Sequence, residues 1–149
     1  MTLVLFSREF VVTSIDVCAK KFQHVRRYYC ENAKDHISLV LEVKNEYYPA
    51  MVGDSLCLTI VNRAHEYDDA DGSSETYEAH EPHIIMSGVR FFVNDIAGRC
   101  MFSMGGLITH LTFAQADETR KYFGFDSSKK VETLVHFNNA DVIQARRFV

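Results

Sequence analysis

Seven histidines and twenty acidic residues give this chain the side chains that acid–base catalysis uses. Those groups must also converge, and the sequence has no Gly-x-Ser-x-Gly turn, no His-Glu-x-x-His pair and no Gly-x-x-x-x-Gly-Lys phosphate loop. Cys100 and His110 are the best candidates for a Cys–His dyad, but the strand pattern described below places them on opposite faces. The sequence therefore predicts a protein without catalytic residues, which is not an enzyme.

Two spacings resemble metal ligands without completing a site. His80 and His83 lie three residues apart in a polar stretch that offers little preorganisation for zinc. The aspartates between positions 68 and 71 resemble the start of a calcium loop but lack the closing Glu at its twelfth position. We expect neither a metal nor another cofactor, and no small-molecule substrate.

The four cysteines are widely spaced and include no Cys-x-x-Cys pair: Cys18, Cys30, Cys57 and Cys100. Each falls in a segment with the pattern of a strand, which predicts free and mostly buried thiols. Free thiols are typical of a reducing compartment, the cytosol or the nucleus.

A small basic patch beside aromatic residues is the one feature that favours nucleic acid, because cations neutralise phosphates and aromatic rings stack on bases. Against this interpretation, Arg26 and Arg27 point to opposite faces of a strand, and strand edges often carry solvated cations. The patch would equally suit acidic or carbonyl groups of a protein partner. Its candidate nucleic-acid residues are Lys20, Lys21, Arg26, Arg27 and Tyr28, with His24 and Tyr29 nearby.

The segment from Arg99 to Phe113 predicts a β-hairpin, because two apolar runs flank Gly105 and Gly106. A two-residue turn there pairs Met104 with Leu107 and fixes the rest of the register. One face then carries the core residues, Cys100, Phe102, Met104, Leu107, Thr109 and Leu111. The other face is too polar for an interior and too apolar for water, which indicates a partner. The candidate interface residues are Met101, Ser103, Gly105, Gly106, Ile108 and His110.

Short segments with strand character recur along the chain and predict an all-β fold, a single domain over residues 1–149. About eight antiparallel strands favour a barrel over a sandwich, because a barrel has no exposed edges. Phe91, Phe92, Phe102 and Phe113 are expected to fill its interior, which argues against a hollow ligand-binding barrel. The expected strands outside the hairpin cover residues 8–17, 22–30, 37–47, 55–62, 83–93, 131–137 and 142–148.

Two of these segments have particular expectations. Residues 83–93 are apolar at both odd and even positions, which predicts a strand covered on both faces, with a bulge or barrel bend at Gly88. In the strand at 55–62, Leu56, Leu58 and Ile60 should face the core, and Thr59 and Val61 should face outward.

Residues 64–82 form an acidic stretch that has no aliphatic side chain larger than alanine. The stretch also contains two tyrosines. We expect a flexible, disordered loop there, either solvated or acting as an acidic docking segment, and we favour the solvated loop. Outside it, basic residues outnumber acidic ones, although the whole chain carries a net charge of −4. No apolar run is long enough to span a membrane, and the first six residues are too short for a signal-peptide core.

Several short segments follow one another in a characteristic order. They are Leu5-Phe6 and Phe10, Lys20-Lys21-Phe22 with Val25, Arg27 and Cys30, Leu39 to Leu41 with Tyr48-Pro49, Gly53-Asp54 before Leu56 to Ile60, and the hairpin with Gly105-Gly106. This ordered set resembles the eighth common subunit of the eukaryotic nuclear RNA polymerases, the small β-barrel subunit shared by polymerases I, II and III. The resemblance covers nearly the whole chain, and it departs from the family at Met104, where an aromatic residue is usual, and at His110, where arginine is usual.

The resemblance implies a barrel related to the OB fold and a non-catalytic subunit that supports polymerase assembly in the nucleus. It implies docking on the largest polymerase subunit, near its pore, through the outer wall of the barrel. An alternative function is a free-standing OB-type protein that binds single-stranded nucleic acid.

Overall fold

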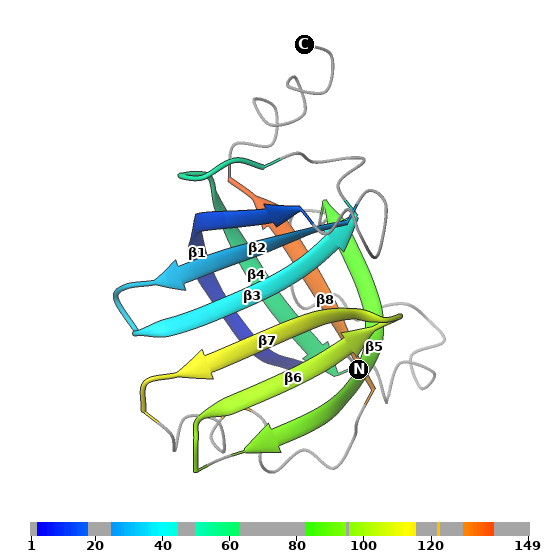
Figure 1. The fold of residues 1–149 in the computed structure, drawn as a ribbon. Coiled ribbons are helices and arrows are strands. Elements are labelled where there is room, and N and C mark those ends of the chain that lie inside the picture. The colour runs from blue at the N-terminus through cyan, green and yellow to red at the C-terminus, as the bar shows by residue number, and fades with distance from the viewer. Residues whose placement is uncertain are drawn as a thin grey trace.

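A computed structural model shows an antiparallel β-barrel closed by hydrogen bonds between every pair of neighbouring strands. It describes residues 3–17, 25–44, 50–62, 83–94, 96–115, 122 and 130–138. The strand order around the barrel is β1-β2-β3-β7-β6-β5-β8-β4, with β4 returning to β1 (Figure 1). The strands are β1 (Leu3–Val17), β2 (Val25–Asn32), β3 (Ile37–Lys44), β4 (Ser55–Asn62), β5 (Ile84–Asn94), β6 (Arg99–Met104), β7 (Leu107–Phe113) and β8 (Lys130–Phe137).

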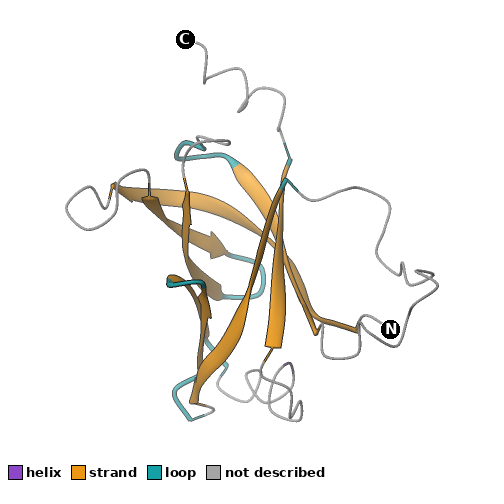
Figure 2. Cartoon of the chain, turned by 90° about the vertical axis from the view of Figure 1, so that its right-hand side faces the viewer, coloured by secondary structure: helices purple, strands orange, loops and turns teal. Residues whose placement is uncertain are grey.

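The all-β class and the eight-stranded closed barrel are confirmed. Figure 2 shows the strands inclined to one another around the barrel. In the residues that the structure describes, no helix has the length and apolar character needed to cross a membrane. The expected loop at 64–82, the strand at 142–148, Cys18 and His80 lie outside the described residues.

The first strand begins at Leu3, five residues before the predicted start, and serves two sides of the barrel. Its first part pairs with β4 and its last part with β2, and Figure 1 shows the bend between them. The register shifts between Val12 and Ser14, as expected where a strand turns a barrel corner. The prediction missed residues 3–7, where Phe6 has its side chain in the core.

Alternating inward side chains fill the interior, as the pattern of β3 and β4 predicts. Leu56, Leu58 and Ile60 have no exposed surface, which confirms their inward orientation. Thr59 and Val61 lie on the opposite, outward face of β4, as expected, but they are only 8% and 0% exposed, so this part of the outer face is covered. The largest fully buried side chains are Tyr28, Phe6, Phe10, Phe102, Ile37, Leu39, Leu41, Leu56, Leu58, Ile60 and Leu111.

The prediction that β5 is covered on both faces is wrong. The first part of the strand pairs with β8 and its last part with β6, yet Ile85 is 57% and Phe91 53% exposed. Phe92 is also partly exposed, so neither phenylalanine fills the interior as expected, whereas Phe102 and Phe113 are buried. Strand pairing satisfies backbone groups but does not cover a face, and an apolar run in the sequence does not report which faces are covered.

Gly88 is a point of close approach and not the predicted bulge. The register shift in β5 lies between Arg90 and Phe92. A Cβ atom at position 88 would collide with the carbonyl oxygen of Ser103 and lie 2.7 Å from the Cα of Met104. The backbones of β5 and β6 therefore approach each other here so closely that only glycine fits.

Candidate interaction surface

The β6–β7 hairpin has the predicted turn and register. Gly105 and Gly106 have φ angles of 66° and 99°, and positive φ at both central residues is typical of a type I′ turn. Met104 pairs with Leu107, and the ladder continues through Phe102–Thr109 to Cys100–Leu111. The turn chemistry is local, so the sequence sufficed to place every cross-strand pair.

The two faces of this hairpin differ in exposure as the alternation predicts. The core face is fully buried at Cys100, Phe102, Thr109 and Leu111, while Leu107 next to the turn is half-buried. On the outer face the candidate interface residues are all half-buried: Met101, Ser103, Ile108 and His110. Gly105 and Gly106 are exposed at the tip.

Glu42 joins three strands where the β3–β7 ladder ends. The last backbone pair is Leu41 with Thr109, and beyond it the Ile108 N–H donates to Glu42 Oε1 at 2.9 Å. Arg27 on β2 donates from Nε and Nη2 to Glu42 Oε2, at 3.0 and 2.7 Å. Since the Glu42 side chain is only 11% exposed, both of its oxygens are satisfied by the protein.

Arg99 and His110 form a diagonal pair on the outer face. Arg99 Nε donates a hydrogen bond to His110 Nε2 at 3.2 Å, which requires that this nitrogen carries no proton. Burial, with the Arg99 charge as a smaller cause, lowers the pKa of His110 and keeps the ring neutral. His110 therefore holds the guanidinium of Arg99 at the position where the hairpin meets solvent.

Of the candidate nucleic-acid residues, the structure describes Arg26, Arg27 and Tyr28. Lys20 and Lys21 lie outside the described residues. Arg27 contacts two acids, Glu42 and, at 3.6 Å, Asp16. Tyr28 has no exposed surface, and burial raises its pKa against the opposing effect of Arg26, so its ring cannot stack on a base in this fold.

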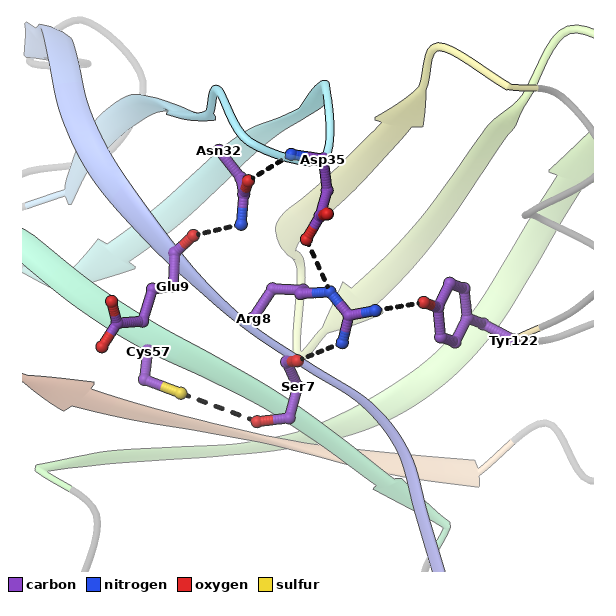
Figure 3. A network of polar contacts seen from close by, with 7 residues as sticks. All are labelled: Ser7, Arg8, Glu9, Asn32, Asp35, Cys57 and Tyr122. Carbon is purple, nitrogen blue, oxygen red and sulfur yellow. Dashed lines mark hydrogen bonds and ion pairs between the residues drawn. The ribbon is translucent and has the colours of Figure 1, made fainter.

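A second polar network closes one end of the barrel (Figure 3). Arg8 donates from Nε to Asp35 Oδ2 at 3.0 Å, from Nη1 to the Ser7 carbonyl at 2.7 Å, and from Nη2 to the Tyr122 hydroxyl. The guanidinium also lies 5.4 Å from the centre of the Tyr122 ring and 5.8 Å from that of Phe6. These contacts join β1, the β2–β3 turn and the chain beyond β7.

Sequence reasoning missed Glu42, Arg99 and Arg8 as organising residues. Each is a charged residue in or beside a strand, where a solvated side chain is the ordinary expectation. The register of three strands was needed to show that Glu42 meets Ile108, and no signal in the sequence reports the diagonal contact of Arg99. The family departure at His110 was the only indication that this position differs.

The described ranges contain no group of three or more His, Cys, Asp or Glu residues that could hold a metal. His83 stacks on Phe137, and its Nδ1 accepts a hydrogen bond from the Phe137 N–H at 2.9 Å. Cys30 and Cys100 are free and buried, and burial raises the pKa of each thiol to about 12. Cys57 is free and half-buried.

Comparison with known proteins adds to this geometry. Residues 8–126 match the family model described as RNA polymerase Rpb8. Proteins from Caenorhabditis elegans and Caenorhabditis briggsae, each named a probable DNA-directed RNA polymerases I, II, and III subunit RPABC3, are 29% identical to the chain over 84 residues. Each alignment covers 56% of this chain and 57% of the relative, so it spans little more than half the length of these curated proteins. Because the family model spans well over half of the sequence, the chain belongs to the RNA polymerase Rpb8 family.

Proposed function

We propose that this protein is a non-catalytic subunit of the nuclear DNA-directed RNA polymerases, where it supports assembly by docking on the largest subunit. Family membership supports this assignment, as do the two relatives, which are named as subunits shared by polymerases I, II and III. The protein acts in the nucleus, where these polymerases work.

The observation that carries the proposal is a filled barrel with a partly apolar outer wall. The interior is occupied by large side chains such as Tyr28 and Phe102, so ligand binding inside the barrel is not favoured. Binding through the wall needs neither a cavity nor a reactive group. The outer face of the β6–β7 hairpin, with Met101, Ile108 and His110, together with the tip at Gly105 and Gly106, is the proposed docking surface.

Single-stranded nucleic-acid binding is not favoured as the primary function. Its described candidates are a buried tyrosine, Tyr28, the half-buried Arg26 that interacts with it, and Arg27, which contacts two carboxylates. A true binder would present exposed rings and several unpaired cations along a groove. Titration of an oligonucleotide at low salt tests this alternative, and micromolar binding that weakens steeply with salt would restore it.

Affinity purification of the tagged chain from nuclear extract tests the proposed function. We expect the largest polymerase subunit and its companions to co-purify with the parent and with Val11→Asp, which changes an exposed position on β1. Ile108→Asp should lose these partners, because a carboxylate would replace an apolar contact in the centre of the docking surface. Recovery of the folded parent without polymerase subunits would refute the proposal. A fluorescent fusion should accumulate in the nucleus.

A further inference from the structure

The outer surface of the hairpin continues onto β5 as a contiguous apolar face. Cross-strand pairs place Val89 beside Ser103 and Ser103 beside Ile108, and a second row contains Phe92, Met101 and His110. Directly paired residues project to the same side of a sheet, so these side chains form one surface. We call Ile85, Val89, Phe92, Met101 and Ile108 the β5–β7 apolar face.

Three side chains of the β5–β7 apolar face are strongly exposed for apolar residues. Ile85 is 57%, Val89 43% and Phe92 37% exposed. Next to them, Phe91 at the bulge is 53% exposed and Ile96 in the following turn is 88% exposed. Single exposed apolar residues are ordinary, but a contiguous group marks an interaction site. In Figure 1 the three strands β5, β6 and β7 lie side by side as one wall of the barrel.

A partner can cover this face by lying across it. The backbone of β5 pairs with β8 over Ile84–Val89 and with β6 over Val89–Asn94. The backbone of β6 is paired on both edges, so the centre of the face offers only side chains to a partner. Recognition therefore depends on side chains, and the partner must supply apolar groups of its own.

Arg99 stands at the border of the β5–β7 apolar face, and one of its nitrogens is held by a hydrogen bond. It occupies the row next to Met101, between Asn94 and Thr112. Its Nε donates to His110 Nε2, and no described residue accepts a hydrogen bond from its two terminal amino groups. Arg99 is exposed, so those amino groups can receive a bidentate carboxylate.

Charge distinguishes the kind of partner. The carboxylate of Glu42 is bound by Arg27 and the Ile108 N–H. A phosphate backbone requires several cations along its path, whereas the described cations at this surface are Arg99 and Lys130, which lies beside Val89 and has an interaction of its own. Aromatic residues, methionine and arginine are the types enriched in protein interfaces.

We propose that Arg99, positioned by His110, binds a carboxylate of a protein partner whose neighbouring apolar side chains cover the β5–β7 apolar face. The inference rests on the proposed function, since the partner is a subunit of the polymerase. It specifies the chemistry of the contact: an Asp or Glu flanked by apolar residues. His110 is a positioning residue, and Arg99 makes the contact.

Photo-crosslinking in a complex of defined composition tests this proposal. The tagged chain is co-expressed with the largest polymerase subunit, with a benzophenone amino acid in place of Met101, and the cross-linked peptide is identified by mass spectrometry. We expect a peptide of the largest subunit that carries Asp or Glu beside apolar residues. The same probe in place of Val11, on the opposite side of the proposed contact, should give no such product.

Binding measurements then assign the cation and the apolar face. Arg99→Gln should weaken the complex by about tenfold or more. Lys44→Gln, which removes an exposed charge at the end of β3, should change binding less than about twofold. Val89→Ser should weaken binding, while Val11→Ser, at a similarly exposed valine, should not. Thermal melting confirms that each variant is folded.

Charge exchange provides the decisive result. Arg99→Glu should abolish binding, and replacement of the cross-linked acid of the partner by Lys should restore it. Unchanged affinity of folded Arg99→Gln, or a cross-link to nucleic acid, to a second copy of the chain or to a peptide without an acid, would overturn the proposal while leaving the polymerase assignment intact. Failure of the parent to bind any polymerase subunit would overturn both.

Discussion

Glu42 shows how one carboxylate joins three strands. Its two oxygens accept hydrogen bonds from the Ile108 N–H and from Arg27, which lie on different strands, in a place where only 11% of its side chain is exposed. Removing a buried carboxylate that accepts hydrogen bonds from a charged side chain and from the backbone lowers stability more than removing an exposed ion pair. Replacing Glu42 and an exposed acid in separate variants therefore compares the stability that a buried and an exposed ion pair contribute.

We expect Glu42→Gln to reduce the free energy of unfolding by about 1.5–3 kcal/mol, because the amide cannot neutralise Arg27. Asp16→Asn should cost at most about 0.5 kcal/mol, because that carboxylate is 54% exposed and lies 3.6 Å from Arg27. Urea unfolding of both variants and the parent measures the difference. Equal losses would mean that burial of Glu42 is energetically unimportant.

The buried thiols predict a dependence of stability on high pH. Burial raises the pKa of Cys30 and Cys100 from the ordinary value of 9.0 to about 12. Between these values the unfolded chain releases the thiol proton and the folded chain retains it, so stability present below pH 9 is lost as the pH rises toward 12.

A Cys100→Ala variant isolates this effect, since every other titrating group is shared with the parent. The stability advantage of the parent over the variant should shrink by about 1.4 kcal/mol for each pH unit above the unfolded pKa. Urea unfolding at neutral pH and near pH 10 tests this expectation. A difference that is constant with pH would contradict the raised pKa.

At the scale of single elements, the hairpin was predictable because its determinants are local. Two adjacent glycines specify the turn, and period-two alternation then assigns each side chain to a face. The exposure of β5 was not predictable, because whether an apolar face is covered depends on which other part of the molecule, or which partner, lies over it. Glu42 and Arg99 depend on contacts between strands that the sequence separates widely.

The turn itself gives a test of local strain. Gly105→Val should reduce the free energy of unfolding by about 1–3 kcal/mol, because a β-branched residue is disfavoured at φ 66°. Gly105→Asn is the matched control and should cost much less, since asparagine tolerates the left-handed region. Melting temperatures of both variants provide the measurement. A valine variant that melts with the parent would show that the turn tolerates side chains.

The junction of β5 and β6 is limited by space and not by φ. Gly88→Ala places a Cβ against the Ser103 carbonyl and 2.7 Å from the Met104 Cα, both backbone atoms that cannot rotate away. We expect a loss of about 2–3 kcal/mol in unfolding free energy. Ser87→Ala, at the adjacent exposed position, should cost little, because it loses only a weak 3.4 Å hydrogen bond to Glu132. A neutral Gly88→Ala would require that the two strands separate without cost.

At the scale of the whole molecule, the outward-facing side chains of the barrel differ in exposure from strand to strand. Val61 on β4 and Leu134 on β8 are outward-facing yet almost completely buried, while β5, which pairs with β8, carries exposed Ile85 and Val89. The closed hydrogen-bond ladder is common to all of these strands, so closure alone does not decide which outer surfaces meet solvent. The sequence therefore predicted the barrel and its interior better than its outer surface, which is where the proposed function lies.

The Arg8 network predicts how one end of this barrel is held closed. The Tyr122 ring lies 5.2 Å from Phe6 and 5.8 Å from Phe113, so it covers the core as well as accepting a hydrogen bond from Arg8. Tyr122→Phe keeps the ring and should cost about 1 kcal/mol, whereas Tyr122→Ala should cost about 2–4 kcal/mol in unfolding free energy. Phe91→Ala, at a 53% exposed ring, is the control and should stay within about 0.5 kcal/mol of the parent. If Tyr122→Ala unfolded in urea like Phe91→Ala, the barrel end would be stable without this ring, because the strand ladder alone would suffice to close it.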